Sequence, residues 1–220
     1  MGLQIVQKTG MAKIKAVADV VFCFDCTGSM GGCIENVKEY ANAFAQGLAS
    51  GKNPVDWRMR ATGYGDLEEG EEMQNSNDFV NTIPEFQAQL EGIQMCFGGD
   101  APESSLDAII VAAKTSKWRK AHKIIVLFTD APTKDLHPST RKKFAINNIK
   151  ELIETLSKDH IKLFLWGPSD PMFNELKIVP KAEITELADP HSDYESENKM
   201  EKLLELMGKT VSDTIGSETL

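Results

Sequence analysis

Aspartate and hydroxyl side chains stand at alternate positions directly after an apolar run. In the stretch VVFCFDCTGSM, the apolar residues lead into Asp25, Thr27 and Ser29. Oxygens at this spacing could belong to a polar turn with Ser29 capping a helix, or they could converge on a cation that prefers oxygen ligands. Gly28, between the two hydroxyl residues, favours a tight loop that turns both inward.

Two further aspartates could join this group. Asp130 follows a second apolar run in HKIIVLFTDAP, and Asp100 follows a glycine pair in MCFGGDAPESS. Three unpaired carboxylates in one place repel one another, and a divalent cation removes that penalty. An all-oxygen ligand set of Asp25, Thr27, Ser29, Asp100 and Asp130 favours Mg²⁺, with Mn²⁺ or Ca²⁺ as alternatives, over zinc or copper.

The elements that must carry these residues alternate between strand and helix. Strands are expected at 18–24, 57–66, 122–132 and 161–167, and helices at 34–48, 78–90, 102–117, 139–158, 184–188 and 195–214. Such alternation is typical of βαβ units with right-handed crossovers. The expected fold is α/β, a doubly wound and mostly parallel sheet flanked by helices on both faces. The carboxyl ends of the strands then share one edge, where ligands bind.

The bulk composition predicts a single domain. We expect an N-terminal edge strand or hairpin over 1–17, the domain over 18–215 and a tail over 216–220. The formal charge of −9 disfavours nucleic-acid binding and docking on anionic lipid. No apolar run approaches the roughly 20 residues that span a bilayer, and the first residues lack the apolar core of a signal peptide. A cytoplasmic location is therefore expected.

Four cysteines, Cys23, Cys26, Cys33 and Cys96, do not resemble a disulfide framework in a chain of 220 residues. The first two form a C-x-x-C pair. The second such pair of a zinc ribbon is missing, and no helix begins directly at this one. A metal or redox role for the C-x-x-C pair is therefore not favoured.

Taken together, the motifs resemble those of von Willebrand factor A (vWA) domains. DCTGS at 25–29 resembles the first metal loop of that family, with Thr27 in place of the first serine. GGDAPE at 98–103 and FTDAP at 128–132 resemble the second and third loops, while GYGD at 63–66 and LFLWG at 163–167 fall where the family has strands. The resemblance covers about 18–215 and is closest to the A domains fused to alpha-type protein kinases.

That resemblance implies a metal-ion-dependent adhesion site (MIDAS) on a Rossmann-like fold. It implies that Asp25, Thr27 and Ser29 hold Mg²⁺, that Asp130 binds it directly or through water, and that Asp100 stands where a threonine is more usual. Three carboxylates and one divalent ion leave a formal charge of −1, which would repel a partner glutamate. We therefore expect either that Asp100 lies outside the direct ligands or that the metal mainly orders the loops.

Asp66 and Glu103 are expected near the metal ligands or on the rim that a partner contacts. Simpler interpretations exist for each acidic residue. Asp66 could be a solvated loop residue, Glu103 could interact with the positive end of a helix, and Asp100 could cap the helix that begins near Pro102.

The expected function is a non-enzymatic protein–protein interaction module. It would be an adaptor or a subunit of a multi-component complex with an ATPase, a kinase or another effector. The alternative is a metal-dependent phosphatase of the haloacid dehalogenase type, which also places an aspartate after its first strand. That chemistry needs a second carboxylate two residues later as acid and base, and position 27 is a threonine.

Overall fold

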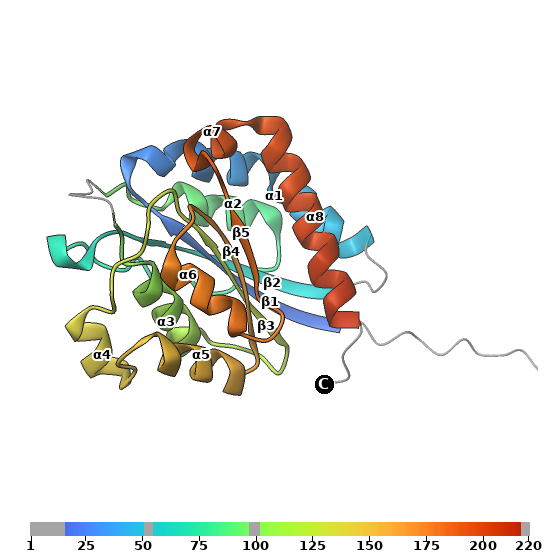
Figure 1. Cartoon of the computed structure of the whole chain (residues 1–220). Coiled ribbons are helices and arrows are strands. Elements are labelled where there is room, and N and C mark those ends of the chain that lie inside the picture. The colour runs from blue at the N-terminus through green and yellow to red at the C-terminus, as the bar shows by residue number, and fades with distance from the viewer. Residues whose placement is uncertain (1–15, 51–54, 97–101, 217–220) are drawn as a thin grey trace, which may run out of the picture.

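Five parallel strands form the centre of the protein (Figure 1). The computed structural model describes residues 16–50, 55–96 and 102–216. Across the sheet the strands lie in the order β2 (Val55–Tyr64), β1 (Ala16–Asp25), β3 (His122–Phe128), β4 (Ile161–Gly167) and β5 (Glu183–Glu186). Phe22 of β1 pairs with Ala61 of β2 on one side and with Val126 of β3 on the other. The predicted α/β fold with a parallel sheet is confirmed.

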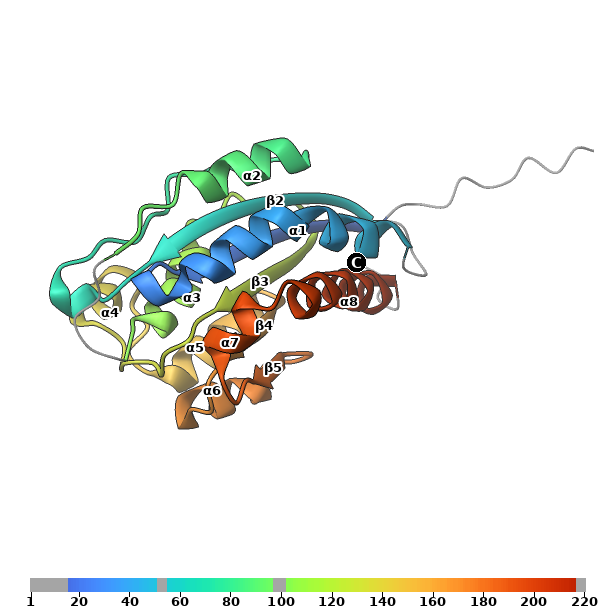
Figure 2. The same cartoon turned by 90° about the horizontal axis from the view of Figure 1, so that it is seen from above.

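Helices cover both faces of the sheet, as the two perpendicular views show (Figures 1 and 2). One face carries α1 (Gly31–Ser50), α2 (Ile83–Glu91), α7 (Pro190–Glu195) and α8 (Glu197–Gly216). The other carries α3 (Ser105–Thr115), α4 (Pro138–Phe144), α5 (Ile149–Lys158) and α6 (Pro171–Glu175). Phe22 and Phe24 pack into the first core, whereas Val21 and Cys23 pack into the second. This double burial explains the continuous apolar run of β1.

Two predicted helices differ from the structure. The expected helix over 184–188 is wrong, because residues 183–186 form β5 and pair with β4. The expected helix over 139–158 is divided into α4 and α5. Ala145 ends α4 with a left-handed φ of 54°, and the side chain of Asn148 caps α5 by accepting from the backbone N–H of Glu151. An asparagine cap satisfies a helix N–H that has no partner within the helix.

Two other helices begin later than expected. α2 begins at Ile83, because the chain before it runs along β2 and forms antiparallel bridges from Val80 to Met59 and from Gln74 to Gly63. These contacts cover the outer edge of β2, which would otherwise expose unpaired backbone groups. α3 begins at Ser105, three residues after the expected start.

The two predicted domain boundaries, 17/18 and 215/216, both fall inside elements of secondary structure. β1 begins at Ala16, inside the segment expected as an edge strand or hairpin, and the rest of that segment lies outside the described residues. α8 continues to Gly216, the first residue of the expected tail. Within the described residues, no helix has the length and apolar character needed to cross a bilayer.

Candidate functional site

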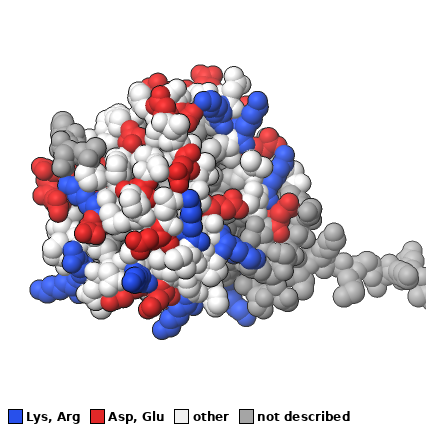
Figure 3. All heavy atoms as spheres, viewed as in Figure 1, with Lys and Arg blue, Asp and Glu red and all other residues white. Residues whose placement is uncertain are grey.

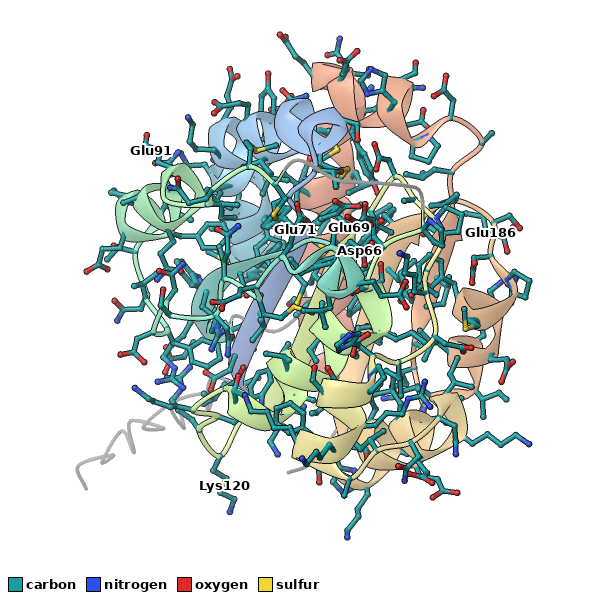
Figure 4. All side chains as sticks on the ribbon, turned by 90° about the vertical axis from the view of Figure 1, so that its left-hand side faces the viewer. Asp66, Glu69, Glu71, Glu91, Lys120 and Glu186 are labelled. Carbon is teal, nitrogen blue, oxygen red and sulfur yellow. A yellow bond between two sulfur atoms is a disulfide. The ribbon has the colours of Figure 1, made fainter. Side chains whose placement is uncertain are left out.

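Adjacent strands bring two of the predicted ligand loops together. Asp25 is the last residue of β1, and Asp130 lies two residues after the end of β3, the neighbour of β1 in the sheet. The chain passes from β1 to β2 on one side and later to β3 on the other, so this is the point at which the strand order reverses and ligands bind. Figure 4 views the molecule from the side on which these strands end.

Asp25 is fully buried and has no ion-pair partner among the described residues. Its Oδ1 accepts hydrogen bonds from the backbone N–H of Thr27 at 3.0 Å and from the Thr27 hydroxyl at 2.8 Å. Its Oδ2 accepts from the Thr129 hydroxyl at 3.0 Å. Burial raises the pKa of Asp25 to about 6 against these hydrogen bonds, and the negative charge of Asp130 raises it further. The side chain is therefore oriented but not neutralised by a cation.

The two hydroxyl residues of the first loop lie beside this carboxylate. The Oγ atoms of Thr27 and Ser29 are 3.3 Å apart, with Thr27 nearly buried and Ser29 exposed. Thr27 occupies the cap position of the short 3₁₀ turn Gly28–Met30, but its side chain makes no cap hydrogen bond. Helix capping therefore does not account for the Thr27 hydroxyl, which donates to Asp25 instead.

Thr129 is a site residue that the sequence interpretation missed. Its hydroxyl bonds to Asp25, and the backbone N–H of Ala131 donates to that same hydroxyl at 3.2 Å. The hydroxyl of Tyr194 donates to the Thr129 carbonyl at 3.1 Å. The available signal was its position in FTDAP, between the apolar strand and Asp130. Thr129 thus fixes Asp25 to the loop that carries Asp130.

Two more predicted residues, Asp66 and Glu103, are buried near the same edge. Lys134 donates to Asp66 Oδ2 at 2.6 Å, so Asp66 is not a solvated loop residue. Glu103 is 3% exposed, and its Oε2 accepts no hydrogen bond from any described residue. Burial, followed by the charges of Asp25 and Asp66, raises the pKa of Glu103 to about 8. Glu103 lies two residues before α3 rather than in its first turn, where Asp107 is the acidic residue.

Acidic side chains also gather outside this buried group. Figure 4 shows Glu69 and Glu71 near Asp66 on the same edge of the sheet. The backbone N–H of Asp66 donates to Glu71 Oε2 at 2.8 Å. On the face seen in Figure 3, acidic and basic side chains are mixed.

Asp100, the remaining predicted ligand, lies outside the described residues. Across 16–50, 55–96 and 102–216, no group of three or more His, Cys, Asp or Glu side chains could hold a metal ion. The described part of the candidate site consists of two carboxylates, Asp25 and Asp130, and the hydroxyls of Thr27 and Ser29. All of these donors are oxygens, as a site for Mg²⁺ or Ca²⁺ requires.

The structure contains one disulfide, although the cysteine spacing did not resemble a disulfide framework. Cys26 and Cys96 are joined, with their Cα atoms 5.3 Å apart, while Cys23 and Cys33 are free and buried. The bonded residues are 70 positions apart in the sequence, so their spacing gave no local signal. The C-x-x-C pair does not act as a unit, because Cys23 packs into the core and Cys26 bonds to Cys96.

Comparisons with known proteins agree with the fold. A family model described as the von Willebrand factor A domain matches residues 19–163, more than half of the chain. Comparison with curated proteins finds no match. Two structures of proximal thread matrix protein 1 from the mussel byssus are similar over 90% of this chain, with TM-scores of 0.60 and identities of 13% and 14%. This chain covers 47% and 46% of those chains, less than half of their length. At such low identity the likeness shows the fold alone.

Proposed function

The chain belongs to the von Willebrand factor A domain family, and we propose that it is a non-enzymatic protein-interaction module whose binding surface surrounds a Mg²⁺ ion. Asp25, Thr27, Ser29 and Asp130 would hold the ion, and Asp100 is a further candidate ligand. When bound, Mg²⁺ would supply a positive centre that offsets the buried negative charge and offers a coordination position to a partner.

The observation that carries this proposal is the state of Asp25. A buried carboxylate normally pairs with a cationic side chain or with a metal, because an isolated charge is costly away from water. Asp25 has only uncharged donors from Thr27 and Thr129 among the described residues. Those donors leave the carboxylate ordered beside Asp130, an arrangement that suits a divalent cation.

The charge at the centre determines the kind of partner. Asp25 and Asp130 together balance one Mg²⁺, and a partner carboxylate could then complete the coordination of the metal. If Asp100 also binds directly, the centre carries a formal charge of −1 and disfavours an acidic partner by about 1 kcal/mol. Replacing Asp100 with threonine should therefore strengthen binding of an acidic partner if Asp100 is a direct ligand, and should leave it unchanged if Asp100 lies further out.

We further propose that the partner is a protein, such as an ATPase, a kinase or another effector subunit, and that this chain serves as its adaptor. The family membership supports an interaction role, and the formal charge of −9 argues against nucleic acid as the partner. The phosphatase alternative is not favoured. Thr27 occupies the position where an acid–base carboxylate would stand, and its hydroxyl donates to Asp25.

Capture of partners from the source organism tests this proposal. The tagged chain is used with excess Mg²⁺, with EDTA, and as the Asp25→Ala variant in Mg²⁺. A partner that depends on the metal is retained by the wild type in Mg²⁺ and is lost in the other two conditions. Ser50→Ala, a change of an exposed side chain at the far end of α1 from the ligand loops, is the control and should keep the partner. Equal capture in Mg²⁺ and EDTA would contradict a metal-centred binding surface.

A further inference from the structure

The Cys26–Cys96 disulfide ties the first loop of the candidate metal site to the chain that follows α2. Cys26 lies directly between Asp25 and Thr27. The backbone N–H of Cys96 donates to the Cys26 carbonyl at 2.6 Å, and Thr27 pairs with Cys96 in an isolated parallel bridge. One covalent bond and one backbone hydrogen bond therefore hold the residues that follow Asp25.

The two halves of this disulfide differ in their access to solvent. Cys26 is fully buried, whereas Cys96 is partly exposed. The preceding residues Gln94 and Met95 are also accessible, with Met95 45% exposed. Thiol–disulfide exchange requires a thiolate to reach one of the two sulfurs. An incoming thiolate reaches this bond from the Cys96 side.

The surroundings of Cys26 also suit a reduced thiol. Cys26 Sγ lies 2.9 Å from the Tyr64 carbonyl oxygen, and the side-chain amide of Gln74 donates to the same sulfur at 3.3 Å. The thiol formed on reduction can donate to the Tyr64 carbonyl, so no buried polar group is left without a partner. Packing around Cys26 is therefore compatible with both oxidation states.

We propose that Cys26–Cys96 is a redox modification site, reduced by a dithiol, that sets the metal affinity of the adjacent centre. This inference rests on the proposed function. In reducing compartments, disulfides are usually transient and serve catalysis or redox sensing. A purely structural disulfide instead resists thiol–disulfide exchange under native conditions.

The exchange proceeds in two steps and transfers two electrons. One thiol of the dithiol gives its proton to water and attacks Cys96 Sγ as a thiolate, the bond between the two protein sulfurs breaks, and Cys26 leaves as a thiolate that takes the proton of the second thiol. The second thiolate then attacks the reductant sulfur of the mixed disulfide and releases Cys96 as a thiolate, which takes from water the proton lost in the first step. The protein gains two thiols and the reductant becomes a disulfide, so the reverse reaction with an oxidised dithiol restores the starting state.

The expected consequence follows from the position of the bond. Thr27 contributes both its backbone N–H and its hydroxyl to Asp25 Oδ1. With the disulfide broken, the Cys26–Thr27 segment keeps its backbone contact to Cys96 but loses the covalent tie. Losing a group that orients a metal ligand costs about tenfold in affinity at the lower end of the usual range, and we expect an effect of that size.

Calorimetric titration with MgCl₂ tests this inference on the oxidised protein and on protein reduced with dithiothreitol and desalted without oxygen. Alkylation in denaturant followed by mass measurement gives the thiol count, and far-UV circular dichroism monitors the fold. We expect the Mg²⁺ dissociation constant to rise about tenfold on reduction and to recover on reoxidation. The Cys26→Ser/Cys96→Ser double variant should bind as the reduced protein does and ignore dithiothreitol. Cys23→Ala, which leaves the disulfide in place, should respond like the wild type.

Three results would overturn the redox site while leaving the metal centre intact. These are equal dissociation constants in the two states, a disulfide that dithiothreitol does not reduce in the folded protein, and loss of the fold on reduction. The last two would identify the bond as purely structural. If neither state binds Mg²⁺, the proposed function fails, and this inference fails with it.

Discussion

Two aspartates on β1 have the same burial and opposite surroundings. Asp19, near the start of the strand, and Asp25, at its end, are both fully buried. Arg58 donates to the two oxygens of Asp19 at 2.9 and 2.6 Å, and Arg119 donates through its side chain at 2.8 Å and its backbone N–H at 2.7 Å. Asp25 receives hydrogen bonds only from uncharged groups among the described residues.

The pKa values reflect this difference. Burial raises the pKa of Asp19, but hydrogen bonds from Arg58 and Arg119 outweigh it and leave the pKa below its usual value. At Asp25 burial outweighs the hydrogen bonds, and the pKa rises to about 6. Two arginines thus balance the charge of Asp19 at the amino end of β1, while Asp25 at the carboxyl end holds a negative charge that a cation would balance.

The largest effect on the free energy of unfolding is expected on substitution of Asp19. Asp19→Ala leaves two arginines without their shared partner, which should lower the free energy of unfolding by about 3 kcal/mol. This value is at the low end for a broken buried pair because the Arg58 and Arg119 side chains keep 24% and 30% of their exposure. Urea unfolding measures the change. A loss below about 1 kcal/mol would mean that Asp19 is not the structural anchor described here.

Removing the carboxylate charge at the other end of β1 should raise the free energy of unfolding instead of lowering it. Asp25→Asn removes a buried charge, and the new amide can accept from Thr27 and donate to the Thr129 hydroxyl. Because two pKa units correspond to about 3 kcal/mol, we expect the metal-free variant to be more stable than the wild type by about 2 kcal/mol at pH 7.5. Urea unfolding in EDTA measures it. A variant less stable than the wild type would show that the Asp25 carboxylate stabilises the metal-free fold, as Asp19 does.

The pH dependence of the metal-free protein sharpens the contrast. In the unfolded chain the pKa values of the Asp25 and Glu103 side chains are 3.8 and 4.5. In the folded protein Asp25 and Glu103 keep their protons up to about pH 6 and 8 respectively, because their pKa values are raised. The contribution of these two carboxyls to stability is therefore fully present below about pH 4. It falls as the pH rises, up to about pH 6 for Asp25 and about pH 8 for Glu103. The advantage of Asp25→Asn should appear between pH 4 and 6, and that of Glu103→Gln should continue to grow up to about pH 8.

Thermal unfolding in EDTA, followed across pH 4 to 9, measures both curves against the wild type. Advantages that stay constant with pH would show that the two carboxyls titrate alike in the folded and unfolded chains, against the raised pKa values.

The smallest effect on stability is expected at Ser29. Its hydroxyl is exposed and contacts only the Thr27 hydroxyl among the described residues, so Ser29→Ala should change the free energy of unfolding by less than about 0.5 kcal/mol. The Mg²⁺ dissociation constant should nevertheless rise at least about tenfold if this oxygen is a ligand. Unchanged Mg²⁺ affinity would remove Ser29 from the centre.

The sequence predicted the central strands and the Asp25 loop, because apolar runs that end in polar residues are local signals. The short strand β5 was predicted as a helix. Residues 183–186 are partly or fully exposed, so no burial pattern distinguishes the two, and pairing with β4 decides the outcome. Ala145 gave no sign of ending α4, since alanine is the strongest helix former and its left-handed φ of 54° has no signal in the local sequence.

Contacts between distant residues were the other limit. The interaction of Asp66 with Lys134 and the disulfide from Cys26 to Cys96 join positions 68 and 70 residues apart. Neither has a spacing rule that a single sequence could reveal. The same holds for the two arginines on Asp19. The register between β1 and β2 places Arg58 beside it, and Arg119 comes from the segment between α3 and β3. Residue types at the site were therefore predictable, and their pairing was not.

Calorimetric titration of Mg²⁺ into metal-stripped protein at pH 7.5 is the most direct test of the difference between the two ends of β1. We expect one binding site in the wild type and none in Asp25→Asn, with the variant still folded by circular dichroism. A wild type that binds neither Mg²⁺ nor Mn²⁺ nor Ca²⁺, or an Asp25→Asn variant that binds as tightly as the wild type, would contradict it.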